Sequence, residues 1–145
     1  MDQDVSELED PCDIVSHRLN RCLYVFYRDC DAKPYRIFCL DTTGHVIRQW
    51  ITGKSYGTIS VTHDCNVIVA FSDRTALIEY SCHGRLLLEL VIRFEEGVTG
   101  LLHARKLRSG LFLISYSGVC PKNHGLSLMD ANGDVLKSVS DTKGL

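Results

Sequence analysis

The sequence predicts an all-β protein built from three repeated four-stranded units, and three observations support this fold class. Short runs of apolar and β-branched residues alternate with turn residues about every ten positions, which is typical of antiparallel sheets. These runs fall into sets of four, and a turn containing glycine precedes the fourth run of each set. Helical periodicity is weak, because Gly97 and Gly100 interrupt the single helical candidate at 95–107.

The individual strands are expected where apolar residues lie between turn formers. Polar and charged residues at 18–21, 62–66 and 106–110 separate the first strand of each set from the second. Longer loops at 30–34 and 118–125 separate the second and third strands in the first and third sets. The strands expected, in chain order, are 13–15, 22–27, 35–40, 46–51, 58–61, 67–71, 76–80, 86–92, 101–104, 111–116, 126–129 and 135–139.

The turn before the fourth strand sets the register of the repeat. A glycine stands three residues after an Asp or Ser in every copy: Asp41 and Gly44, Ser81 and Gly84, Asp130 and Gly133. Glycine suits a hairpin position with positive φ. An Asp or Ser side chain can close such a turn by accepting hydrogen bonds from the backbone N–H groups that follow it. We therefore expect these residues to have a structural role in tight turns.

The spacing of these glycines identifies the repeated unit. Successive glycines are 40 and 49 residues apart, close to the roughly 40–50 residues of a four-stranded propeller blade. The sequence therefore predicts a partial β-propeller of three four-stranded antiparallel blades, at about 13–52, 58–92 and 100–141. The domain is expected to span 13–145 and to follow a disordered acidic tail at 1–12.

One stretch of the chain resembles a known repeat family. Residues 59–70 (ISVTHDCNVIVA) resemble the opening of an NHL repeat, in which a polar turn with Asp and Asn separates two apolar strands. Residues 77–87 are similar to its second half, and residues 103–110 resemble divergent NHL-like blades of invertebrate tripartite-motif-type proteins. The resemblance extends over 13–141 but departs at Cys65, which replaces a glycine often found there. It implies a scaffold that binds partners through loops on one propeller face.

Composition and charge exclude several functional classes. Hydrophobic residues make up 45% and charged residues 23% of the 145 residues, as in globular proteins. The net charge is −2, so the chain as a whole does not attract nucleic acid or acidic lipid. Its apolar runs are far shorter than the roughly 20 residues that a membrane-spanning helix needs, so no membrane partner is expected.

The cysteines and the N-terminus indicate a cytoplasmic protein with reduced thiols. The seven cysteines are irregularly spaced and form no CxxC pair. Residues 1–10 are acidic and lack the basic and apolar regions of a signal peptide. Because thiols stay reduced in the cytosol, we expect all seven cysteines to be free.

The turns between first and second strands carry the candidate binding residues. They are Arg18 and Arg21 in the first blade, His63 in the second, and Arg105, Lys106 and Arg108 in the third. Together with what the NHL resemblance implies, these residues favour a non-enzymatic scaffold that binds a protein partner through loops on one propeller face. An RNA-binding NHL-type module is the alternative, because these residues would give the face a cationic rim.

A propeller hydrolase or lyase with a metal site in its channel is the third interpretation. Cys and His lie close together in the sequence at 63–65, 82–83 and 120–124. Zinc needs four ligands, and these pairs fall on separate turns. The sequence has no Gly-x-Ser-x-Gly nucleophile motif, and no set of acidic or His residues repeats across the blades. We therefore expect no catalytic residue, no metal site and no cofactor.

The number of blades predicts incomplete closure. Closed propellers have roughly 4–8 blades, so three blades are about half of a six-bladed ring. Each blade packs against the next, which would leave an apolar face uncovered at each end. We expect these faces to contain Ile14, Tyr24 and Phe38 at one end and Phe112, Ile114 and Leu128 at the other. A homodimer that completes a six-bladed ring, or a longer propeller that contains this chain, would cover them.

Overall fold

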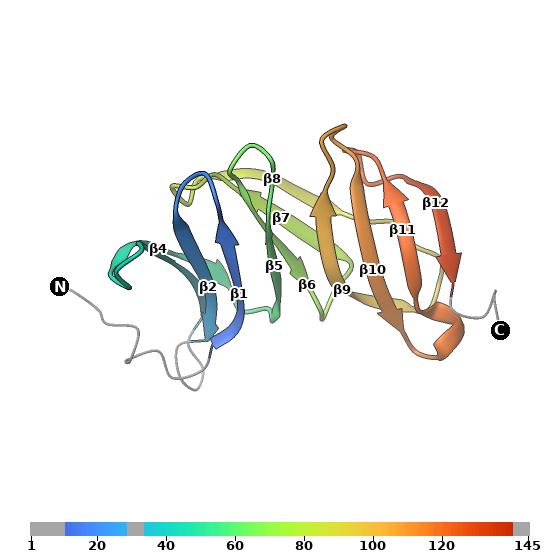
Figure 1. Ribbon diagram of the computed structural model, residues 1–145. Coiled ribbons are helices and arrows are strands. Elements are labelled where there is room, and N and C mark those ends of the chain that lie inside the picture. Colours follow the sequence, from blue (N-terminus) through green and yellow to red (C-terminus); the bar gives the residue numbers. More distant parts are fainter. Residues whose placement is uncertain (1–10, 29–33, 141–145) are drawn as a thin grey trace.

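The computed structural model describes residues 11–28 and 34–140, which form three four-stranded antiparallel sheets (Figure 1). Each sheet is a meander, with strand orders β1-β2-β3-β4, β5-β6-β7-β8 and β9-β10-β11-β12. The described sheets follow one another along the chain and do not close into a ring (Figure 1). The predicted fold class, an all-β partial propeller of three blades, is confirmed.

The strands agree closely with those expected from the sequence. The first blade contains β1 (Pro11–His17), β2 (Cys22–Arg28), β3 (Tyr35–Leu40) and β4 (Val46–Gly53). The second contains β5 (Gly57–Val61), β6 (Val67–Phe71), β7 (Ala76–Tyr80) and β8 (Leu86–Val91). The third contains β9 (Val98–Lys106), β10 (Phe112–Gly118), the short 3-10 helix η2 (Pro121–Asn123), β11 (Gly125–Met129) and β12 (Val135–Ser140).

Most boundaries differ by one or two residues, and two strands begin at least two residues earlier than expected. β1 begins at Pro11, inside the segment expected to be disordered, because proline is tolerated as the first residue of a strand. The rest of that expected tail, 1–10, lies outside the described residues. β9 begins at Val98, earlier than expected, and occupies most of the segment that was the helical candidate. Gly100 lets this strand lie directly against the backbone carbonyl of Ser72, where a side chain would not fit.

The core consists of two apolar layers, one between each pair of neighbouring blades. Successive side chains of a strand point to opposite faces, so alternate residues of the second blade enter different layers. The layer between the first and second blades includes Tyr24, Phe26, Ile37, Val69 and Phe71. The layer between the second and third blades includes Ile68, Leu77, Leu101, Phe112, Ile114 and Met129.

The expected composition of the end faces is wrong for half of the residues named. Three of those side chains point into the layers between blades and are at most 1% exposed: Tyr24, Phe112 and Ile114. Phe38 lies on the outer face of the first blade, where it is buried in a cluster with Val25, Tyr27 and Leu40. Ile14 is exposed and Leu128 is half-buried. Successive side chains of a strand point to opposite faces, so an error of one residue in the assignment places a side chain on the wrong face.

The turns between third and fourth strands, here called the outer turns (41–45, 81–85 and 130–134), share one geometry. Their glycines, Gly44, Gly84 and Gly133, have φ angles of 87°, 84° and 89°. Each glycine N–H donates to the carbonyl of the residue three positions earlier: Asp41, Ser81 or Asp130. Oδ1 of Asp41 and of Asp130 each accepts two further backbone N–H groups, at 2.9 and 3.0 Å. These residues therefore close hairpins.

Candidate functional site

The turns that join the first and second strands, here called the inner turns, gather at one face of the molecule. They cover 18–21, 62–66 and 107–111, and they lie along the top of Figure 1. Each contains one residue with positive φ: Arg21 at 49°, Cys65 at 68° and Gly110 at 90°. The first two turns therefore hold a side chain in a conformation that favours glycine, at a cost of about 1–3 kcal/mol each.

Hydrogen bonds between blades position the inner turns. Thr58 Oγ1 donates to the carbonyl of Leu102 (2.9 Å), which links β5 to β9. A second such bond runs from Ser60 Oγ to the carbonyl of Ala104 (2.6 Å). On the other side, the Ile59 N–H donates to Asp13 Oδ2 (2.9 Å) and links β5 to β1. The first strands of the three blades therefore lie side by side and hold their turns together.

A hollow of about 410 Å³ lies among the inner turns, and residues of all three blades line it. We call it the basic trough. It brings together five of the residues selected from the sequence: Arg18, His63, Arg105, Lys106 and Arg108. Arg21 is exposed at the end of the first inner turn and does not line the trough. The cationic residues come from the first and third blades, while the second blade contributes Val61, Thr62 and His63.

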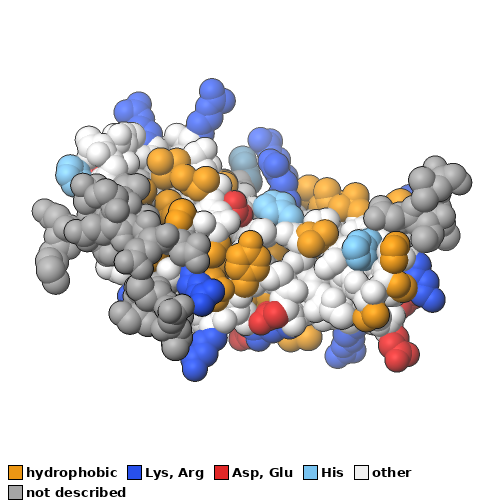
Figure 2. All heavy atoms as spheres, turned by 90° about the horizontal axis from the view of Figure 1, so that it is seen from below, with side chains coloured by type: hydrophobic (Ala, Val, Ile, Leu, Met, Phe, Trp, Pro, Cys, Tyr) orange, Lys and Arg blue, Asp and Glu red, His pale blue; other side chains and the backbone are white. Residues whose placement is uncertain are grey.

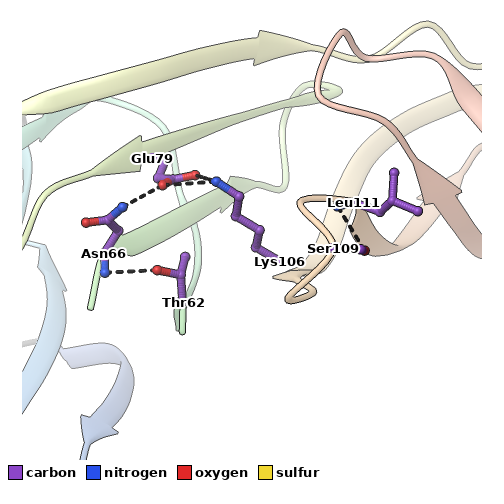
Figure 3. Close-up of polar contacts among 6 residues, drawn as sticks. All are labelled: Thr62, Asn66, Glu79, Lys106, Ser109 and Leu111. Atoms are coloured by element: carbon purple, nitrogen blue, oxygen red, sulfur yellow. Dashed lines mark hydrogen bonds and ion pairs between the residues drawn. The ribbon is translucent and has the colours of Figure 1, made fainter. Parts of the chain in front are cut away.

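Lys106 is neutralised by a carboxylate that sequence reasoning missed. Its Nζ lies 3.0 and 3.4 Å from the two carboxylate oxygens of Glu79, a β7 residue that is only 3% exposed. Asn66 Nδ2 also donates to Glu79 (2.8 Å), and the Asn66 backbone N–H donates to Thr62 Oγ1 (3.0 Å) (Figure 3). The position of Glu79 inside the apolar run 76–80 could have indicated such a pair. A buried carboxylate needs a cation or hydrogen-bond donors.

The three arginines of the trough keep their charge available. Arg18, Arg105 and Arg108 are exposed. Within the described ranges, none of the three forms an ion pair. Asp64 stands in the second inner turn but does not line the trough. Among the described residues, positive charge in the trough is therefore paired with a carboxylate only where Glu79 contacts Lys106.

A second hollow, of about 510 Å³, adjoins the trough along the first strands of the blades. It shares Ser16, Val61 and Arg105 with the trough and adds Asp13 and His103. The Asp13 carboxylate accepts the N–H groups of Ile14 and Ile59, both at 2.9 Å. The wall formed by the first strands therefore has a basic end at the inner turns and a carboxylate farther along.

The side chains that could ligate a metal lie apart from one another in the described residues. Nowhere in 11–28 or 34–140 do three His, Cys, Asp or Glu side chains gather as metal ligands. Burial raises the pKa of the Cys39 thiol to about 12, so this cysteine is protonated at neutral pH. The thiols of Cys22, Cys39, Cys65, Cys82 and Cys120 are free, and Cys30 lies outside the described ranges. No helix in the described part of the chain is long and apolar enough to cross a membrane.

The opposite face of the molecule lacks a comparable concentration of one charge. Figure 2 shows this face, seen from below relative to Figure 1, with basic, acidic and hydrophobic side chains interspersed. The hollow at its third-blade end is lined by Arg93 and Lys122 together with Glu95. The basic trough is therefore the better candidate for selective recognition.

Comparison with known proteins supports the fold alone. No known protein family matches this chain, and no curated protein is similar to it. Its fold is similar to the crystal structure of a protein of unknown function from Bacteroides caccae, with a TM-score of 0.58 and 15% sequence identity. The similarity covers 86% of this chain and 44% of the bacterial protein. The chain therefore spans less than half the length of that structural neighbour.

Proposed function

We propose that this chain is a non-enzymatic binding module that recognises a protein partner through the basic trough. The observation that carries the proposal is the convergence of the inner turns, because side chains from three separate blades line one hollow. Recognition residues commonly lie on loops that a rigid scaffold positions. We also propose that the blades are of the NHL type, on the basis of the polar turn at 62–66 between two apolar strands.

Exposed aliphatic side chains beside the arginines favour a protein partner. Leu19 is 78% exposed and Leu107 is 37% exposed, and both line the trough. Protein interfaces combine a buried apolar centre with a polar rim. The trough offers both kinds of contact within one surface.

RNA binding is less well supported than protein binding. The arginines would attract phosphates, but the trough lining contains no Phe, Tyr or Trp. Proteins that bind unpaired nucleotides usually stack the bases on such large rings. In this lining, bases could stack only on the smaller imidazole rings or on the arginine planes, so an RNA ligand would be held mainly by its backbone.

Capture from a ribonuclease-treated native lysate tests the proposed function. The site variant is Leu19→Ser with Leu107→Ser, which leaves the charge unchanged. The matched control is Leu87→Ser with Leu136→Ser, on the outer strands β8 and β12, where these leucines are 48% and 55% exposed. We expect wild type and control to capture the same proteins and the site variant to lose them. Equal capture by all three would contradict the proposal.

A further inference from the structure

We infer that the basic trough takes an acidic, extended segment of the partner, with carboxylates on its arginines and aliphatic side chains on its leucines. This inference rests on the proposed function and adds the chemistry of the partner. The charges support it first: Arg18 stands on one side, Arg105 and Arg108 on the other, and no described residue pairs with them.

Arginine is the side chain best suited to hold a carboxylate. Its planar guanidinium can donate two parallel hydrogen bonds to both carboxylate oxygens. The middle of the trough belongs to the second blade, which contributes Val61, Thr62 and His63 and no lysine or arginine. A segment that crosses the trough therefore meets guanidinium groups near both ends and uncharged or histidine side chains between them.

Asp64 is exposed in the second inner turn but does not line the trough, and two other acidic groups near the trough are already hydrogen-bonded. Glu79 is buried and its oxygens are occupied by Lys106 and Asn66. Asp13 accepts two backbone N–H groups and belongs to the adjoining hollow, not to the trough itself. Lys106, in turn, supports the trough wall and is not counted as a ligand, because Glu79 already holds its charge.

The apolar part of the surface separates a peptide from a nucleic acid. Leu19 and Leu107 are the exposed aliphatic side chains of the trough, one from the first blade and one from the third. An extended peptide that alternates acidic and aliphatic residues presents both contacts at once, since neighbouring side chains of an extended chain point in different directions. The trough lining contains no Phe, Tyr or Trp, which are the large platforms on which bases usually stack.

Fluorescence anisotropy with defined probes tests this inference on the full chain. The probe is a short labelled peptide alternating glutamate and leucine, and the comparison ligands are a lysine–leucine peptide, a glutamate–serine peptide and a single-stranded RNA. We expect the glutamate–leucine peptide to bind most tightly and added salt to weaken its binding. Reversing the charge in Arg18→Glu and in Arg108→Glu should lower its affinity at least about tenfold for each arginine.

The control is Arg85→Glu, the same charge change in the second outer turn, which should alter affinity less than about twofold. Circular dichroism verifies that each exposed-turn variant is folded. Equal binding of the lysine–leucine peptide, no binding of the glutamate–leucine peptide, or no effect of the two trough variants would overturn the inference. Tightest binding by RNA would do the same and would assign the trough to nucleic acid. If lysate capture still depends on Leu19 and Leu107, the proposed function survives that failure.

Discussion

The inner and outer turns lie at the same end of each four-stranded meander but differ in their sequences. Each outer turn has glycine at its fourth position, with φ between 84° and 89°, and an Asp or Ser at its first. The inner turns place Arg21, Cys65 and Gly110 at positive φ, and they share no common side-chain pattern. The second and third inner turns nevertheless form the same backbone hydrogen bonds as the outer turns. The repeat therefore preserves the sequence of one set of turns and lets the sequence of the other set vary.

The space around the turn glycines explains why the outer turns keep glycine and not all of the inner turns do. A Cβ added to Gly84 would lie 2.7 Å from the Trp50 ring, and one added to Gly133 would lie 2.7 Å from the carbonyl oxygen of Val91. A Cβ added to Gly110, in the third inner turn, would meet nothing within 4 Å. Outer turns of the second and third blades are thus part of the packing between blades. The third inner turn, in contrast, has open space around Gly110.

The largest expected effect concerns the support of the third inner turn. Lys106→Met removes the cation beside Glu79, which is 3% exposed, and leaves a buried carboxylate unpaired. We expect the free energy of unfolding to fall by about 3–5 kcal/mol, measured by urea denaturation. Adding Glu79→Met to this variant should restore most of the loss, because an apolar pair can replace a buried ion pair. A loss below about 1 kcal/mol for Lys106→Met would show that the carboxylate is not held as described.

The second prediction compares a glycine from each set of turns. Gly110→Ala should lower the free energy of unfolding by about 1–2 kcal/mol, because alanine disfavours positive φ. No further cost is expected there, since the added methyl group would meet no neighbour. Gly84→Ala should cost that amount and about 1–3 kcal/mol more, because its methyl group collides with Trp50. Urea denaturation of both variants measures the difference. Equal losses would mean that the outer turn does not pack against the first blade.

The third prediction concerns Cys65, which has a φ of 68° in the second inner turn. Cys65→Gly should raise the free energy of unfolding by about 1 kcal/mol, since relief of backbone strain exceeds the extra entropy that glycine loses on folding. Cys65→Ser keeps the backbone restriction and controls for loss of the thiol. Thermal denaturation of the two variants should rank Gly above Ser. The reverse order would show that the turn is not strained.

Much of this fold could be predicted from the sequence, because period-two alternation and turn glycines are local signals. Gly44, Gly84 and Gly133 mark the same turn in three copies, and their spacing identifies the blade. The side of β2 on which Tyr24 lies was not predictable in this way. Both faces of β2, as of β6, are apolar, so alternation does not separate them. In β10 the alternation does mark the side that holds Phe112, but it does not show whether that side faces a neighbouring blade or the end of the molecule.

The candidate site was only partly predictable, for a related reason. Turn position was sufficient to select Arg18, His63 and Arg108, because inner turns of consecutive blades must meet at one face. The pairing of Lys106 with Glu79 joins residues 27 positions apart on different blades. Such a contact depends on how two blades pack, which no local pattern contains. The sequence therefore located the cations but did not show which of them was already neutralised.

The smallest expected effect is a pH dependence in the first outer turn. The hydrogen bond from Thr43 Oγ1 (2.6 Å), with bonds from the backbone N–H groups of His45 and Thr43, lowers the pKa of Asp41. A lowered pKa in the folded state stabilises the protein above the unfolded value of about 3.9, and this contribution is lost as pH falls through the folded value. Asp41→Ser, which copies Ser81 of the second blade, should remove it. The difference in unfolding free energy between wild type and variant should therefore shrink between about pH 5 and pH 2.

Asp134→Ser is the matched control for this measurement. Asp134 lies in the third outer turn, and its carboxylate accepts no hydrogen bond from any residue in the described ranges, while its backbone N–H donates to Asp130 (3.0 Å). The two variants thus lose the same charge at similar exposed turns, but only at Asp41 does that charge accept hydrogen bonds, from Thr43 and His45. Urea denaturation at a series of pH values should show convergence with wild type in acid for Asp41→Ser and not for Asp134→Ser. Identical pH profiles would mean that the outer turn is closed by its glycine alone, with no contribution from the carboxylate.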